Sequence, residues 1–286
     1  MRATAQAPQT ARVVAFYNPP MKTKLPSAWR GAWCALVLST LSVLAQAPPA
    51  TGPWLSLFNG QDLTGWTPKF RGCELGENFN NTYRVEGGIL KVGYDKYDKF
   101  DTRYGHLFYK APYSNYVFRC EYRFVGTQCP GGAGWAFRNS GVMVHCQPPA
   151  TMRKEQEFPV SIEVQILGGN GKDPRTTGNV CTPGTVVSMA GKVIHDHCID
   201  STSPTLHGDQ WVTLEVEVHG HGALINKING TPVFLCEQPA LDPADADAKK
   251  IIAARGGNTA LNGGYISLQA ESHPCEFRKL ELRPLP

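Results

Sequence analysis

Short segments that alternate apolar and polar residues recur along this chain and constrain its fold more than any other feature. Val160–Leu167, Trp211–His219 and Tyr265–Glu271 each place apolar side chains at every second position. Successive side chains of a β-strand point to opposite faces, so each segment predicts a strand with one face in a core. Asn229 and Gly230 separate two such segments and predict a tight hairpin turn.

The segments between these strands are rich in Gly, Pro, Asn and Asp, and only Asp242–Lys250 has the composition of a helix. Many short strands with frequent turn signals predict an all-β sandwich or barrel. No repeat and no long linker divides the chain. The sequence therefore predicts one β domain, which about 240 residues are enough to form.

The first 45 residues have the pattern of a secretory signal. Five basic residues and no acidic residue precede a 15-residue apolar run, Gly31–Ala45, which ends in small residues. Such a run is shorter than the ~20 residues that span a bilayer, although an uncleaved membrane anchor is the alternative. We expect cleavage after Ala45, export to the periplasm or the exterior, and an Ala/Pro spacer over residues 46–53. Met21, followed by Lys22 and Lys24, is an alternative initiator.

Removal of this leader changes the charge of the protein. Taking its five basic residues from the 28 Lys and Arg leaves 23, against 24 Asp and Glu, a net charge of −1. A near-neutral body gives no electrostatic reason to expect nucleic acid or, after cleavage, a membrane as partner.

The nine cysteines become eight once Cys34 leaves with the leader. An even set in an exported chain indicates disulfides. Cys181 and Cys198 flank a loop rich in Gly, Pro and His, and we predict that they pair. The alternative is a metal site formed by His195, His197 and Cys198, which no Cys-x-x-Cys spacing supports.

An ordered series of motifs resembles one known family, the 3-keto-disaccharide hydrolase domain. Its N-terminal signature is similar to Leu57–Trp66, which reads LFNGQDLTGW, and Val85–Leu90 follows in the family's order. Asn139–His145, Glu163–Leu167 and Gly264–Gln269 continue the series. The match covers nearly all of residues 55–286. The chain departs from the family pattern in two ways. It has more cysteines than most members, and it has His273-Pro-Cys275 where many members have a Gly after the His.

The resemblance implies a concanavalin A-like lectin/glucanase jelly roll over residues 54–286, a sandwich of two antiparallel sheets. It also implies an exported enzyme acting on di- or oligosaccharides, or other glycosides, oxidised at C3. In such a sugar the carbonyl acidifies the C2 proton. A base then gives an enolate that expels the group at C1, and water adds back. This route needs a base, a group that stabilises the enolate oxygen and an acid for the leaving oxygen.

Glu163 and Gln165 share the polar face of the Val160–Leu167 segment, beside a long irregular loop, and such loops often form sites. We expect Glu163 to act as base or metal ligand, and Gln165 to orient substrate or else to cap the sheet edge. His145 is a candidate acid, base or ligand, or a structural histidine. Together Glu163 and His145 are candidate ligands of a divalent cation, which would stabilise an enolate. Glu163 is the only carboxylate on its segment, which argues against two-carboxylate hydrolysis unless Glu271 supplies the second.

The other candidates lie near predicted strand ends. Arg138 and Asn139 are candidates for binding the 3-keto or enolate oxygen, although Arg138 also suits an ordinary surface ion pair. Glu271 and His273 are weaker substrate-binding candidates. Trp135 and Tyr104 are candidates for stacking on sugar rings, with ordinary packing as the alternative.

Two alternatives to the 3-keto-glycoside enzyme stay open. One is a non-catalytic carbohydrate-binding module of the same fold, which needs aromatic rings and amides but no base. The other is a conventional glycoside hydrolase with two carboxylates.

Overall fold

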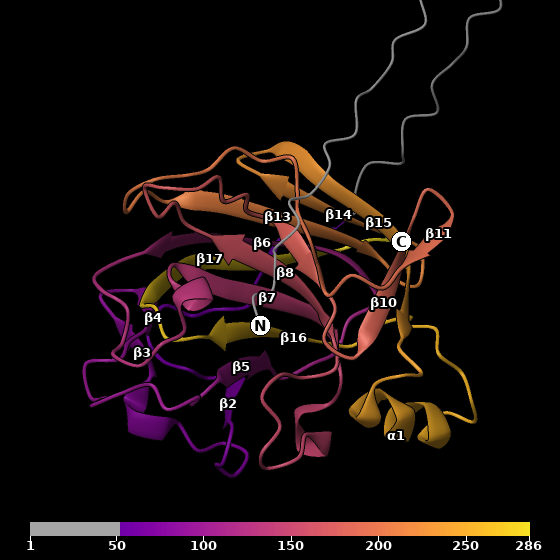
Figure 1. The fold of residues 1–286 in the computed structure, drawn as a ribbon, viewed down its shortest axis with the longest axis horizontal. Helices are drawn as coiled ribbons and strands as arrows, with labels where there is room; N and C mark the ends of the chain where they lie inside the picture. Colours follow the sequence, from indigo (N-terminus) through magenta and orange to yellow (C-terminus); the bar gives the residue numbers. More distant parts are fainter. Residues whose placement is uncertain (1–51) are drawn as a thin grey trace, which may run out of the picture. The chain divides into compact units, whose positions relative to one another are not determined.

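The computed structural model describes residues 52–286, which form two antiparallel β-sheets and one α-helix (Figure 1). The predicted leader, and the predicted spacer up to Thr51, lie outside the described residues. No helix within 52–286 is both long and apolar enough to cross a bilayer.

The larger sheet has ten strands in the order β11-β10-β15-β14-β13-β6-β17-β4-β3, with β1 paired to β17. Its strands are β1 (Leu55–Ser56), β3 (Tyr83–Glu86), β4 (Ile89–Val92), β6 (Asn115–Phe124), β10 (Thr185–Met189), β11 (Lys192–Ile194), β13 (Val212–His219), β14 (Ala223–Ile228), β15 (Thr231–Leu241) and β17 (Cys275–Pro284).

The smaller sheet has seven strands in the order β12-β9-β8-β7-β16-β5-β2. They are β2 (Trp66–Phe70), β5 (Gly105–Tyr109), β7 (Asn139–Cys146), β8 (Ile162–Leu167), β9 (Asn179–Cys181), β12 (Cys198–Ile199) and β16 (Tyr265–Ala270). Figure 1 shows β8, β7, β16 and β5 side by side, so strands far apart in the sequence meet in this sheet.

The helical segments connect the strands. They are η1 (Phe79–Asn81), η2 (Gly134–Ala136), η3 (Pro149–Thr151) and α1 (Ala246–Ala254). Helix α1 begins and ends four residues later than the predicted Asp242–Lys250, because the Asp245 carboxylate accepts from the N–H groups of Asp247 and Ala248 and caps the helix there.

The core lies between the two sheets and follows the predicted alternation. In β8, Ile162, Val164 and Ile166 are buried in it, as are Ile266, Leu268 and Ala270 in β16. Asn229 and Gly230 join β14 to β15 with positive φ values of 49° and 81°, as the predicted tight turn requires. The two-sheet jelly-roll prediction is confirmed. The opposite face of the smaller sheet, its outer face, carries the polar residues of β7, β8 and β16.

Candidate active site

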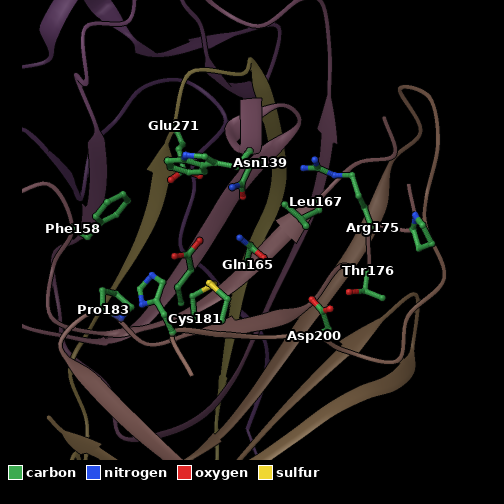
Figure 2. Close-up of a pocket in the computed structure, with 15 residues that line it drawn as sticks. Asn139, Phe158, Gln165, Leu167, Arg175, Thr176, Cys181, Pro183, Asp200 and Glu271 are labelled. Carbon is green, nitrogen blue, oxygen red and sulfur yellow. A yellow bond between two sulfur atoms is a disulfide. The ribbon is translucent and has the colours of Figure 1, made fainter. Parts of the chain in front are cut away.

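A pocket of about 580 Å³ lies on the outer face of the smaller sheet (Figure 2). It is lined by Trp135, Asn139, Phe158, Glu163, Gln165, Leu167, Pro174, Arg175, Thr176, Cys181, Pro183, His197, Cys198, Asp200 and Glu271. Most of the walls are apolar, whereas carboxyl and amide groups gather on the strands beneath. A concave site of this size with a few convergent polar groups suits a small molecule such as one or two sugar rings.

Two carboxyl groups lie on these strands. Glu163 belongs to β8, and Glu271 follows the last residue of β16, with β7 between the two strands. Glu163 reaches across β7 at Gly141, where a Cβ atom would stand only 2.7 Å from its Oε1. The side chains are only 6% and 3% exposed, so both carboxyl groups are largely withdrawn from water.

Burial changes the protonation of both groups. It raises the pKa of Glu163 to about 8, and the neighbouring Gln269 amide opposes this rise by a smaller amount. Burial also raises the pKa of Glu271 well above its usual value, and the nearby Glu163 carboxylate raises it further. Burial therefore favours the neutral form of both carboxyl groups, and the two groups titrate as an interacting pair.

The Gln165 amide is oriented by its neighbours. Asn179 Nδ2 donates to Gln165 Oε1 over 3.0 Å, and the Asn179 oxygen accepts from the Thr176 hydroxyl and the Ser201 N–H. Because the oxygen of Gln165 is engaged, its Nε2 is the end left to donate into the pocket. Asn139, a lining residue nearly opposite on β7, has a buried Oδ1 with no partner. Gln165 and Asn139, which were both candidates for contacting the substrate, therefore both line the pocket.

Trp135 lines the pocket from η2 and is 55% exposed. Its ring is stacked on that of Tyr104, with 6.4 Å between centroids and 13° between planes. Tyr104 itself is buried and does not line the pocket. The Trp135 ring is therefore the exposed member of the pair, and the buried Tyr104 ring packs parallel to it.

The structure places Arg138 outside the pocket, in contrast to its predicted role. Its guanidinium forms an ion pair with Asp209 and donates to the Gly208 carbonyl. Arg138 has a left-handed backbone with φ of 43°, which interrupts the strand pattern just before β7. The alternative of an ordinary ion pair fits this arrangement.

His145 also does not line the pocket. Its φ of 53° breaks the alternation near the end of β7, and its ring lies beside the backbone of Gly220 and Gly263. Burial lowers the pKa of His145 to about 4, so the ring is neutral at pH 7. The pocket therefore does not bring together the two predicted cation ligands: Glu163 lines it, and His145 does not.

Within residues 52–286 no group of three or more His, Cys, Asp or Glu side chains is placed to hold a metal ion. The divalent cation stays a prediction, which dialysis against EDTA followed by an activity assay tests.

His273 is packed edge-on against Phe124 and Phe137, with ring centroids 5.8 and 4.9 Å away. Burial and the nearby Arg138 lower the pKa of His273 to about 4. It is not a lining residue. His197, by contrast, lines the pocket, next to Cys198.

Among the pocket residues that sequence reasoning missed, four carry polar groups or an aromatic ring: Phe158, Arg175, Thr176 and Asp200. All lie in irregular segments that flank β8, β9 and β12. The long loop of residues 168–178 was the one available signal, but no periodicity indicates which of its side chains turn inward.

The predicted disulfide is confirmed. Cys181 and Cys198 are joined, and the bond links β9 to β12 in the pocket wall. The even number of cysteines indicated disulfides in general, but the other six described cysteines are free and buried, at Cys73, Cys120, Cys129, Cys146, Cys236 and Cys275. They occupy core positions, where a thiol packs as a small apolar side chain.

Two packed antiparallel sheets with a carboxyl-bearing pocket on one outer face define a jelly-roll protein with a small-molecule site. The chain belongs to the 3-keto-alpha-glucoside-1,2-lyase-like domain family, whose model matches residues 53–283. This membership supports a carbohydrate-active, glycosidase-like function. No curated protein matches the sequence.

Several solved structures are similar. A candidate glycosyl hydrolase from Parabacteroides distasonis ATCC 8503 is 18% identical with a TM-score of 0.47, over 82% of this chain and 94% of that one. The carbohydrate-binding module CBM66 from Bacillus subtilis is 11% identical with a TM-score of 0.43, over 77% and 95%. A β-1,3-1,4-glucanase derived from a mouse hindgut metagenome is 10% identical with a TM-score of 0.44, over 82% and 100%.

Proposed function

We propose that this protein is an exported enzyme that cleaves 3-keto-glycosides by proton abstraction at C2, elimination at C1 and addition of water. The observation that carries the proposal is the pair of buried carboxyl groups, Glu163 and Glu271, which line one pocket and whose pKa values are both raised by burial. Such a pair supplies one base and one acid in the same pocket.

Glu163 is the base in this proposal. A pKa of about 8 makes its carboxylate a stronger base than an ordinary one, and a fraction of it is ionised near neutral pH. It takes the C2 proton, and the electron pair left on C2 moves into the carbonyl to form the enolate. The Gln165 Nε2 group, fixed by Asn179, donates to the oxygen on which this charge develops.

Glu271 is the acid. Because its pKa is raised well above the usual value, it keeps its proton and gives it to the oxygen that leaves C1. Water then adds at C1 and returns a proton to Glu271, while Glu163 returns its proton to C2. The net reaction is hydrolysis, and both carboxyl groups recover their starting states.

A conventional two-carboxylate hydrolase is the second candidate, because the structure places Glu271 near Glu163 after all. The presence of a single carboxylate on β8 therefore does not distinguish the two reactions. The substrate distinguishes them instead: the proposed route requires the 3-keto group that acidifies the C2 proton, whereas a conventional two-carboxylate enzyme cleaves the unoxidised sugar.

The deciding experiment offers a 3-keto-disaccharide and its unoxidised parent to the same protein preparation. We expect turnover of the oxidised sugar, with exchange of the C2 hydrogen for deuterium in deuterated water. Turnover of the parent alone would overturn the proposal in favour of conventional hydrolysis.

The variant Glu163→Gln separates an enzyme from a binding module. Loss of the base is expected to lower kcat about 10²- to 10⁴-fold while sugar binding persists. Glu237→Gln, an exposed carboxyl on β15, is the matched control. Bound sugar with no turnover by the unmodified protein would instead identify a carbohydrate-binding module.

Export is part of the proposal and is supported by the leader pattern and by the Cys181–Cys198 disulfide, which forms in oxidising compartments. Fractionation of the native host, with recovery of the protein from the periplasm or medium, tests it. Recovery from the cytosol alone would contradict it.

A further inference from the structure

Arg175 is the one arginine or lysine among the residues that line the pocket. It lies in the loop between β8 and β9 and is fixed at both ends. Its backbone N–H donates to the Thr205 hydroxyl over 2.8 Å, and its Nη2 donates to the Phe137 carbonyl over 2.6 Å. The guanidinium is therefore held in one position before any ligand arrives.

No carboxylate of the described chain lies within ion-pair distance of Arg175, whereas Arg138 is paired with Asp209 and Arg153 with Asp247. Burial lowers the pKa of Arg175, and only Asp173 opposes this effect. A partly buried cation without a counter-ion is unfavourable unless something else neutralises it. The buried Nε has no partner either.

The direction of the side chain indicates where an anion would sit. In Figure 2 the Arg175 guanidinium extends toward Asn139, on the side of the pocket away from Phe158. Since Nη2 has a second hydrogen and Nη1 has no acceptor among residues 52–286, these two atoms form an end-on pair of donors. Such a pair matches the two oxygens of a carboxylate.

The rest of the pocket admits an anion at this end. Burial raises the pKa of both Glu163 and Glu271, which reduces the negative charge that these carboxyl groups present to an anion. Asp200 is the other lining residue with a carboxyl group, and it is exposed at the rim, where water screens its charge.

We propose that Arg175 is a specificity residue that binds a carboxylate carried by the substrate, so that the preferred substrates are acidic 3-keto-glycosides. The proposal rests on the proposed function for its reaction and on Arg175 for its selectivity. It assigns a substrate class to the pocket: glycosides in which a sugar acid, or an acid group on the leaving portion, accompanies the 3-keto sugar.

The test uses two matched pairs of 3-keto-glycosides. The first pair differs at C6 of the oxidised sugar, carboxylate against hydroxymethyl, with one common leaving group. The second pair has the same sugar with a 4-carboxyphenyl or a 4-(hydroxymethyl)phenyl leaving group. A charged hydrogen-bonded contact predicts kcat/KM about 10- to 100-fold higher for the acidic member of one pair. The pair that responds locates the carboxylate.

Variants separate selectivity from structure. Arg175→Gln is expected to abolish the preference for the acidic member while leaving the neutral member within a few-fold, and Arg175→Lys is expected to restore part of it. Arg255→Gln removes one exposed positive charge at the end of α1 and controls for net charge. If Arg175→Gln slows acidic and neutral substrates equally, Arg175 only supports the loop and the proposal is overturned.

A binding measurement keeps this result distinct from failure of the proposed function. Calorimetry compares methyl glucuronide with methyl glucoside, neither of which carries a 3-keto group. Tighter binding of the glucuronide that Arg175→Gln removes supports the acidic subsite at the sugar even without turnover. Equal binding together with equal kcat/KM within both substrate pairs would overturn it.

Discussion

At position 141 strand β7 carries a glycine, and the Glu163 side chain occupies the space beside it. A Cβ atom there would lie 2.7 Å from Glu163 Oε1 and 2.8 Å from Cγ, closer than real contacts allow. The backbone at this glycine does not have the positive φ that only glycine adopts easily. Position 141 therefore needs a glycine because the Glu163 side chain occupies the space that a Cβ atom would fill.

The substitution Gly141→Ala is accordingly expected to displace the Glu163 carboxyl while the strand keeps its conformation. A displacement of about 1 Å at a reacting group costs about 10²-fold in rate, so kcat should fall by that order. Gly52→Ala, where the added Cβ meets only ordinary contacts of 3.5 Å or more, is the control. Full activity of Gly141→Ala would show that Glu163 tolerates displacement and is not the base.

The raised pKa of Glu163 predicts opposite pH trends for activity and stability. As a base it works when ionised, so kcat/KM should rise with pH up to about 8. The folded protein binds this proton more tightly than the unfolded chain. Its contribution to stability is therefore complete below the unfolded pKa of about 4.3 and is lost as pH rises through about 8.

We therefore expect the Tm of the native protein to fall between about pH 5 and 8, and Glu163→Gln to reduce that fall. Thermal melts of both proteins across this range, beside kcat/KM of the native protein, measure the two trends. A Tm that rises with pH over the same range in the native protein but not in Glu163→Gln would contradict the assigned pKa.

At the residue scale the sequence predicts side chains that follow strand alternation and misses those that depend on tertiary order. Glu163 and Gln165 face the pocket as their period-2 pattern indicates. Glu271 reaches the same pocket because β7 is inserted between β8 and β16, an order that no local pattern encodes. His145, a candidate acid, base or ligand, lies away from the pocket because a single positive φ ends the alternation near the end of β7.

At the scale of elements, the short strand β12 depends on its link to β9. The two strands pair through only two residue pairs, Cys181 with Cys198 and Val180 with Ile199, and the disulfide joins the first pair. The same bond forms part of the pocket wall, and Cys181 is paired on its other side with Glu163. The disulfide therefore stabilises the fold and shapes the site together.

Replacement of both Cys181 and Cys198 by Ala removes a cross-link that closes a short loop, with a sequence separation of 17. A loop of that size contributes about 3 kcal/mol, which corresponds to a fall in Tm of roughly 6–12 °C. Activity should fall at temperatures well below the new Tm, because the wall beside Glu163 loosens. Calorimetry and kinetics at 25 °C measure both effects, and unchanged kinetics would mean that β12 keeps its place without the bond.

Element by element, strands were more predictable than their ends and connections. Hydrophobic alternation marks β8, β13 and β16 because each buries one face in the core. The loop of residues 168–178 carries Arg175 into the pocket through single hydrogen bonds to Thr205 and Phe137, which come from distant segments. Side chains placed in this way have no sequence period to reveal them.

At the scale of the whole molecule, the two faces that the core does not use differ in chemistry. The outer face of the larger sheet carries paired charges, such as Arg119 with Glu281 and Arg123 with Glu276. The outer face of the smaller sheet instead carries amides and buried carboxyl groups around the pocket, on β7, on β8 and at the end of β16. Paired charges suit a solvated surface, whereas the second face is arranged for a ligand.

The cysteines distinguish two accounts of how the whole fold is stabilised. The sequence alone favours a set of disulfides, whereas the structure shows one bond and six thiols that are at most 5% exposed. Burial raises the pKa of the Cys146 and Cys236 thiols to about 12, which makes them poor nucleophiles. A large core of two packed sheets does not need further cross-links to be stable.

A thiol titration of protein that starts at Gln46, and so lacks Cys34, tests this account. Thiol reagents should find almost no reactive group in the native protein, six after unfolding without reductant, and eight after unfolding with reductant. The sample must come from an oxidising compartment and be unfolded at low pH, because thiol–disulfide exchange would otherwise create or remove pairs. A count of four or fewer without reductant would show additional disulfides. That result would support the expectation, drawn from the leader and the even number of cysteines, of several disulfides in an exported protein.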